Sequence, residues 1–192
     1  MDLSKYRLIK TRKNGIRYFK YSDIARIEEK EFLIFHYPYD YLNEFEKKEA
    51  IVVLFSGKTG DGKSTAINVF FNIIKGVKLD DNFRFILIDE SSNNRGQDQS
   101  QTDGIHFYYL KDYAKRPLIL IDSQGFADIR GIKYDYLLDK SFEYAFSSKL
   151  DHINAVCFIV KSTDQRLNPL SRYVIGKVTG LFAEDIENNF FF

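Results

Sequence analysis

Residues 51–64 read IVVLFSGKTGDGKS, an apolar run that leads straight into a glycine-rich loop. From Gly57 to Ser64 the loop fits G-x-x-x-x-G-K-[ST] at every defined position. In such a loop the backbone N–H groups turn inward around phosphate oxygens, and glycines adopt the positive φ angles that this path requires. We therefore predict a buried strand, then a phosphate-binding loop, then a helix that opens near Lys63.

The loop offers two side chains and a row of amides to a nucleoside triphosphate. Lys63 is expected to reach the β- and γ-phosphates, and the Ser64 hydroxyl is expected to ligate Mg²⁺. The following helix points the positive end of its dipole at the same phosphates. The candidate cofactor-binding residues of this segment are Gly57, Lys58, Thr59, Gly60, Asp61, Gly62, Lys63, Ser64 and Thr65. The alternative, a chance glycine-rich turn, is disfavoured because strand, loop, Lys-Ser pair and helix follow in the required order.

From residue 51 onward, short apolar runs and helical periodicities alternate along the chain. Strands are expected at 51–55, 83–88, 105–110, 117–121 and 155–160, and helices at 63–75, 134–150 and 170–182. This alternation predicts an α/β protein with a mostly parallel central sheet flanked by helices, and nucleotide bound at the carboxyl ends of the strands. Residues 1–49 are predicted to form a small β-rich extension, in which two strands flank an Asn14-Gly15 turn and the charged stretch 43–50 is a linker to the first core strand.

A second motif follows the apolar run Pro117–Ile121, which delivers Asp122 at its end. Asp122 is expected to orient a water on the Mg²⁺, and Gly125 completes Asp-x-x-Gly, where a backbone N–H approaches the γ-phosphate. In the polar stretch 89–103, Thr102 is the candidate threonine for Mg²⁺ and the γ-phosphate. The predicted metal ligands are thus Ser64, Thr102 and Asp122, and the predicted catalytic residues are Lys63, Thr102 and Gly125. An ordinary turn after a strand and an exposed loop threonine are the alternatives.

Three segments together resemble the AIG1-like and septin-related branch of the translation-factor-class GTPases: Gly57–Thr65, Ile121–Ile132 and Val156–Ser162. The resemblance covers residues 50–190 and is most specific around the two phosphate motifs. It implies a P-loop NTPase of the G-domain fold that binds GTP or GDP with Mg²⁺ and hydrolyses GTP. It also implies assembly through G domains, so the expected partners are guanine nucleotide, a second copy of the domain and, as in some members, a membrane surface.

Departures from the family pattern bear on hydrolysis and on base recognition. Phe126 follows Gly125, where Ras-like GTPases place a water-orienting glutamine, so intrinsic hydrolysis is expected to be slow. The family reads the base with Asn/Thr-Lys-x-Asp after a strand that here starts at Phe190, so the domain of residues 50–192 is expected to be incomplete at its C-terminus. Lys161-Ser162-Thr163-Asp164 superficially resembles such a base-reading motif, but it follows the preceding strand and is interpreted as a turn. The preference for guanine over adenine therefore depends on the resemblance alone.

Composition excludes several other classes of protein. The 192 residues carry a net charge of +1, so no global field recruits nucleic acid, and no nucleic-acid partner is expected. The basic residues between Lys5 and Lys20 suit anionic lipid or nucleic acid, but a solvated hairpin face is the favoured interpretation. The single cysteine, Cys157, forms no intramolecular disulfide and is interpreted as a small buried hydrophobe. His36, His106 and His152 show no metal-ligand spacing and are interpreted as surface or strand-flanking residues.

No apolar run reaches the roughly 18 residues of a membrane span, and the first residues lack the apolar core of a secretory signal. A cytoplasmic location is therefore expected. Three functions stay open: a GTP-binding switch that hydrolyses slowly, a scaffold that keeps nucleotide as a structural ligand, and an ATP-using P-loop enzyme. The last ranks lowest because neither an acceptor site nor lid arginines are visible.

Overall fold

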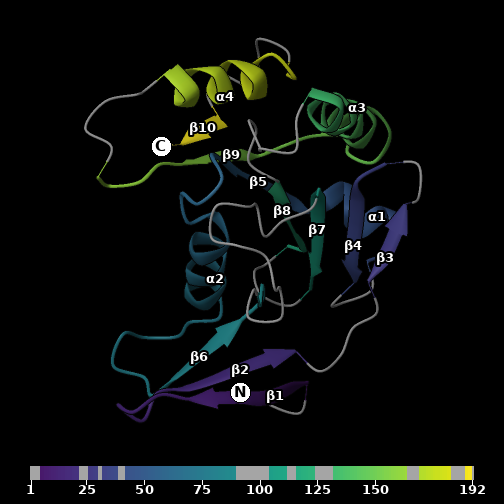
Figure 1. Cartoon of the computed structure of the whole chain (residues 1–192). Helices are drawn as coiled ribbons and strands as arrows, with labels where there is room; N and C mark the ends of the chain where they lie inside the picture. The colour runs from purple at the N-terminus through teal and green to yellow at the C-terminus, as the bar shows by residue number, and fades with distance from the viewer. Residues whose placement is uncertain are drawn as a thin grey trace.

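The computed structural model describes residues 5–21, 26–29, 32–38, 42–89, 104–111, 116–123, 132–163, 169–182 and 189–191. The strands are β1 (Tyr6–Thr11), β2 (Arg17–Tyr21), β3 (Ile27–Glu29), β4 (Ile34–Pro38), β5 (Ile51–Gly57), β6 (Phe83–Ile86), β7 (Ile105–Leu110), β8 (Leu118–Ser123), β9 (Ala155–Ile159) and β10 (Phe190–Phe191). The helices are α1 (Glu44–Glu49), α2 (Lys63–Ile74), α3 (Ile132–Ser148) and α4 (Pro169–Thr179). A seven-stranded sheet of order β10-β9-β5-β8-β7-β4-β3 forms the centre, and β1-β2-β6 form a second sheet (Figure 1).

The central sheet is mixed, so the predicted G-domain architecture with a mostly parallel sheet is wrong, although the α/β class holds. β5 pairs in parallel with β8 and β9, whereas β7 runs antiparallel to β8 and β3 antiparallel to β4. The connection between β7 and β8 explains the first reversal. It consists of residues 111–117 alone, and a parallel pair needs a crossover of about a dozen residues or more.

The strand predicted at 83–88 also lies outside the central sheet. It forms β6, which pairs in parallel with β2 of the N-terminal hairpin. A run such as Phe83-Arg84-Phe85-Ile86 has the composition of a strand in either sheet, so its partner is set by tertiary packing.

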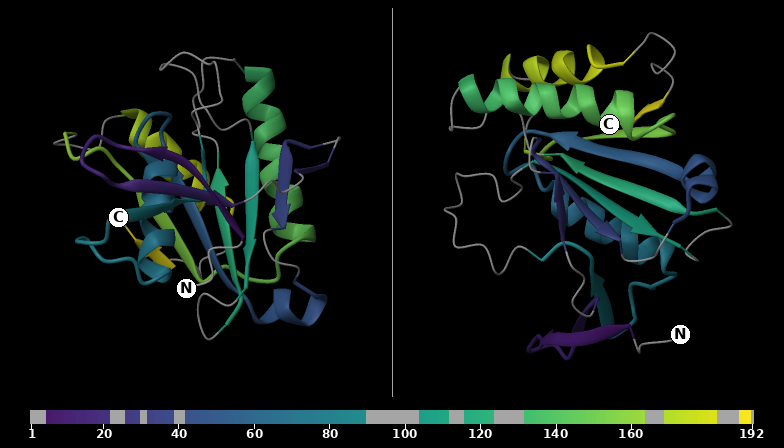
Figure 2. Two further views of the ribbon diagram at one scale, coloured as in Figure 1. Left: turned by 90° about the horizontal axis from the view of Figure 1, so that it is seen from below. Right: turned by 90° about the vertical axis from the view of Figure 1, so that its right-hand side faces the viewer.

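Helices cover the central sheet on both faces (Figures 1 and 2). On one face, Phe142 of α3 and Val174 of α4 share a core with alternate residues of β5, β7 and β8. On the other face, Phe71 of α2 and Phe85 of β6 pack against the remaining alternate residues. The strands are buried on both faces, and that explains why they read as continuous apolar runs. Within the described segments, the helices are all too short or too polar to cross a bilayer.

The N-terminal segment contributes to both sheets. β1 and β2 form the predicted antiparallel hairpin, with Gly15 at φ 81° in its turn. β4 pairs in parallel with β7, which places residues 34–38 in the central sheet. The charged stretch before β5, expected to be a linker, is helix α1, which Asn43 and Glu46 begin with a capping box. The boundary predicted between residues 49 and 50 stays a prediction.

Two asparagines of α2 bind the backbone of β6 and of the residues that follow it. The Asn68 Oδ1 accepts hydrogen bonds from the Leu87 and Ile88 amides at 2.7 and 2.9 Å, and its Nδ2 donates to the Ile88 carbonyl at 2.9 Å. Asn72 repeats the pattern on Phe85, accepting from its amide at 2.8 Å and donating to its carbonyl at 2.7 Å. The side chains of α2 thus supply hydrogen bonds that a neighbouring strand would otherwise make.

Candidate functional site

The loop that connects β5 to α2 lies at the carboxyl end of β5 and has the backbone that its sequence predicts. Gly57, Gly60 and Gly62 have φ angles of 145°, 79° and 94°. Gly57 is also required for space, because a Cβ built there would lie 2.4 Å from the Ile159 carbonyl oxygen. Gly57 pairs with Ile159 in the sheet, so the start of the loop is held against the end of β9.

Helix α2 begins directly at the loop, and its first turn presents backbone donors. Gly62 is the N-cap residue, and no side chain of the described residues caps the helix there. The first amides of a helix lack intrahelical partners and carry its positive dipole end, which is the usual arrangement for binding an anion. Lys63 is 6% exposed, and its Nζ donates to the carbonyls of Gly57 at 3.1 Å and Lys58 at 2.9 Å. The lysine ammonium is therefore held inside the loop.

The other loop residues differ in burial and in charge. Ser64 is buried, whereas Thr65 is exposed on the first turn of α2. The Thr59 hydroxyl oxygen is buried and has no hydrogen-bond partner among the described residues. Asp61 is buried, with its Oδ2 3.9 Å from the Lys58 Nζ. An anionic side chain in this loop opposes a bound phosphate, and the neighbouring Lys58 offsets part of that repulsion.

Asp122 stands near the end of β8, beside the strand that carries the loop. It is 1% exposed and lies opposite Phe55 of β5 on one side and His106 of β7 on the other. Because β5 and β8 are parallel, their carboxyl ends meet at one edge of the sheet, which brings Asp122 and Ser64 to the same end of the molecule. Thr102 and Gly125, the other predicted ligands of Mg²⁺ and the γ-phosphate, lie outside the described residues.

A metal site made only of protein side chains is not seen in the described part of the chain. Within it, no group of three or more His, Cys, Asp or Glu side chains lies close enough to hold an ion. Ser64 and Asp122 are the two predicted metal ligands that the structure describes.

The structure also brings Lys161 to the loop, a residue that the sequence analysis interpreted as part of a turn. Lys161 follows β9, and its Nζ would lie 3.8 Å from a Cβ built on Gly60. The signal that could have found it is its place after a strand parallel to β5, since the ends of parallel strands gather at one edge.

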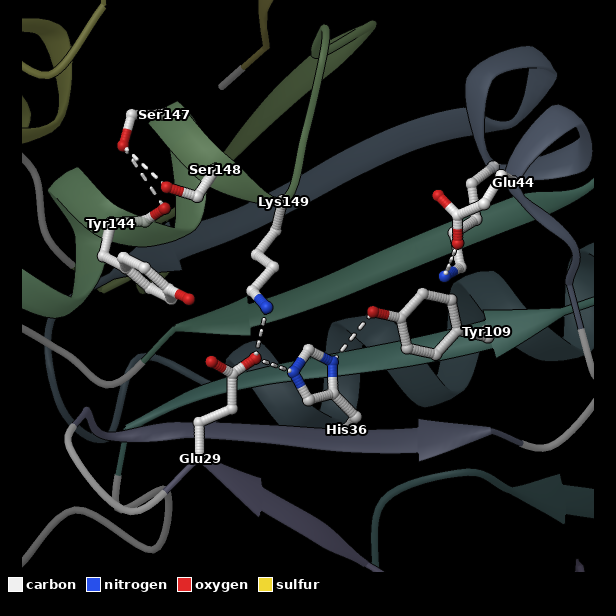
Figure 3. Close-up of polar contacts among 9 residues, drawn as sticks. Glu29, His36, Glu44, Tyr109, Tyr144, Ser147, Ser148 and Lys149 are labelled. Atoms are coloured by element: carbon white, nitrogen blue, oxygen red, sulfur yellow. Dashed lines mark hydrogen bonds and ion pairs between the residues drawn. The ribbon is translucent and has the colours of Figure 1, made fainter.

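A second cluster of polar residues lies near the edge of the central sheet that β4 and β3 form, away from the loop after β5. The sequence did not predict this cluster. Glu29 Oε1 accepts from His36 Nε2 at 2.7 Å and from Lys149 Nζ at 3.0 Å, and His36 Nδ1 lies 2.8 Å from the Tyr109 hydroxyl (Figure 3). An ionised carboxylate only accepts, so Nε2 carries the proton and the Tyr109 hydroxyl donates to Nδ1. This cluster joins β3, β4, β7 and the end of α3.

Burial and hydrogen bonding shift the proton affinities in this cluster. Burial opposes ionisation of Glu29, but the bonds from His36 and Lys149 outweigh it and lower the Glu29 pKa. Burial lowers the pKa of His36 despite Glu29, and the charges of Lys149 and Lys47 lower it further. Burial raises the pKa of Tyr109 well above its ordinary value. The cluster therefore holds a neutral histidine between a phenol and a carboxylate.

We expect the free energy of unfolding to fall in two stages as the pH drops, the first due to His36 and the second due to Glu29. Because His36 has a lowered pKa in the folded protein, the unfolded chain takes up its proton first, and stability declines below about pH 6.5. Glu29 adds a further loss below about pH 4.3, as its lowered pKa is approached. Urea titrations at several pH values measure this slope. His36→Gln should flatten it near pH 6, and an unchanged slope would contradict the assignment.

The other two histidines have hydrogen-bond partners, and His106 is buried within β7, so its interpretation as a surface or strand-flanking residue is wrong. His106 is 7% exposed and lies 3.2 Å from the Tyr37 hydroxyl through Nδ1, and His152 Nε2 donates to the Ala50 carbonyl at 2.9 Å. Cys157 is half-buried in β9, and burial raises the pKa of its thiol. A raised pKa disfavours the thiolate that a cysteine nucleophile needs.

Comparison with protein families and with curated proteins finds no relative of this chain, which matches no protein-family model and no curated protein. The resemblance to AIG1-like and septin-related GTPases thus stays an expectation drawn from the two phosphate motifs.

Proposed function

We propose that this protein binds a guanine nucleoside triphosphate with Mg²⁺ and hydrolyses it slowly, as a conformational or assembly switch. The observation that carries the proposal is the loop between β5 and α2. It combines positive-φ glycines, a helix N-terminus without a side-chain cap among the described residues, and the buried Lys63 ammonium. These are the features that let backbone amides and one lysine surround a polyphosphate.

Each part of the proposal has its own support. Ser64 would ligate Mg²⁺ and Asp122 would orient a water on it, because both lie at the carboxyl edge of adjacent parallel strands. The choice of guanine, the slow hydrolysis and assembly with a second copy follow from the resemblance and from Phe126 after Gly125. A cytoplasmic location, with peripheral membrane contact as an option, follows from the intracellular supply of such a ligand.

Lys63→Ala is expected to weaken binding of a fluorescent GTP analogue about 100-fold, because it removes charge-assisted contacts to the phosphates. Lys78→Ala is the matched control, since this exposed lysine lies beyond the opposite end of α2. Ser64→Ala should abolish the difference in affinity between Mg²⁺ and EDTA buffers. Circular dichroism of each variant verifies that the fold survives. Equal affinity of Lys63→Ala and wild type would refute the proposal.

A scaffold that binds nucleotide without hydrolysing it is the second candidate, favoured by Phe126 in place of a water-orienting glutamine. Single-turnover release of phosphate from GTP, in Mg²⁺ and in EDTA, separates the two. Phosphate release that depends on Mg²⁺ and is lost in Lys63→Ala supports the switch. Competition of ATP against GTP for the bound analogue decides the base, and equal competition would remove the guanine assignment.

A further inference from the structure

Lys161 lies at the phosphate loop through the geometry of β9. Ile159, the last residue of β9, pairs with Gly57 at the start of the loop. That pairing leaves no room for a Cβ on Gly57, so the end of β9 and the loop are fixed against each other. The chain then continues to Lys161, whose Nζ would lie 3.8 Å from a Cβ on Gly60. A lysine remote in sequence is thus placed over the middle of the loop.

The charges around the loop leave the Lys161 ammonium available for a ligand. The Lys63 ammonium is engaged by two loop carbonyls, and Lys58 lies near Asp61. Lys161 is exposed, and in the part of the chain that the structure describes it makes no ion pair. The Lys161 ammonium, held beside backbone amides and a helix N-terminus, adds to a positive potential that favours the binding of an anion.

We propose that Lys161 is a second phosphate-contacting lysine, which binds the polyphosphate of the nucleotide from the solvent side of the loop. The inference rests on the proposed function and deepens it, because it adds a residue to the same site. It replaces the interpretation of Lys161 as part of an ordinary turn. It also differs from base recognition, because Gly60, the residue beside which the Lys161 Nζ lies, belongs to the phosphate loop.

The experiment measures dissociation constants of GTP, GDP and inorganic tripolyphosphate for wild type, Lys161→Ala, Lys161→Arg and Lys78→Ala. Lys161→Ala should weaken binding of GTP and of tripolyphosphate about tenfold, the loss of one charge-assisted contact. Lys161→Arg should bind within about threefold of wild type, since it keeps the charge. Lys78→Ala removes the same charge at the other end of α2 and should bind like wild type. Binding by Lys161→Ala should also depend less steeply on salt.

The outcomes distinguish this inference from the proposed function. If wild type binds GTP and Lys161→Ala binds it equally well, Lys161 has no role and the proposed function stands. A loss seen with GTP but not with tripolyphosphate would assign Lys161 to the base or sugar and overturn the phosphate contact. An equal loss in Lys78→Ala would reduce the effect to net charge and overturn it too. If wild type binds none of the three ligands, the proposed function itself fails.

Discussion

Gly57→Ala is expected to destabilise the folded protein by about 3 kcal/mol or more, one of the largest effects of any single substitution here. The new Cβ would lie 2.4 Å from the Ile159 carbonyl oxygen, which is backbone and has no rotamer by which to move away. The φ angle of 145° adds strain for any residue with a side chain. The Gly57 carbonyl also accepts from Lys63, so the displacement reaches the ammonium. Urea denaturation followed by circular dichroism measures the loss.

Gly76→Ala is the matched control for this prediction. Gly76 has a φ of 71°, but a Cβ built on it would meet no atom within 4 Å. It should therefore cost about 1–2 kcal/mol, the strain of a left-handed conformation without a clash. Equal losses in the two variants would mean that the contact with Ile159 has no energetic weight.

Asn68→Ala is expected to cost about 2–4 kcal/mol, although Asn68 is a partly exposed polar residue of a helix. The substitution removes the acceptor of the Leu87 and Ile88 amides and the donor to the Ile88 carbonyl. Partly buried backbone groups would then lose these three hydrogen bonds, and the loss of a partner inside a folded protein costs more than the bond itself contributes. Hydrogen exchange gives the most direct measurement, because the amides of Leu87 and Ile88 should lose protection before the rest of the chain.

Ile73→Ala provides the comparison on the same helix. Ile73 is 66% exposed, so its truncation should change the free energy of unfolding by no more than about 0.5 kcal/mol. If Asn68→Ala were no more damaging than Ile73→Ala, the side-chain bonds to the residues after β6 would be dispensable.

Much of the element content follows from the sequence, because burial on both faces imposes a pattern. The strands 51–57, 118–123 and 155–159 are apolar runs of the length that a doubly covered sheet requires, and each lies where we predicted it. The loop conformation was predictable for a different reason: few backbone paths satisfy Gly57, Gly62 and a helix that starts at Lys63. Local chemistry determines both features.

The sheet order was only partly predictable from the sequence, since it depends on contacts between distant segments. The reversal of β7 against β8 did have a signal in the sequence, because the stretch 111–117 is too short for the crossover that a parallel pair needs. The parallel pairing of β4 with β7 had none, because it joins the N-terminal segment to a strand far along the chain. The Glu29–His36–Tyr109–Lys149 cluster is drawn from four separate elements, so no spacing in the sequence announces it.

The asparagine bonds of α2 have a mechanical consequence. This helix begins at the glycine-rich loop after β5, and Asn72 on its flank is hydrogen-bonded to β6, which pairs in turn with β2 of the hairpin. Helix α2 therefore cannot rotate about the loop without also moving the three-stranded sheet of β1, β2 and β6. A tilt of the first turn of α2 would therefore also displace the N-terminal hairpin, through β6 and β2.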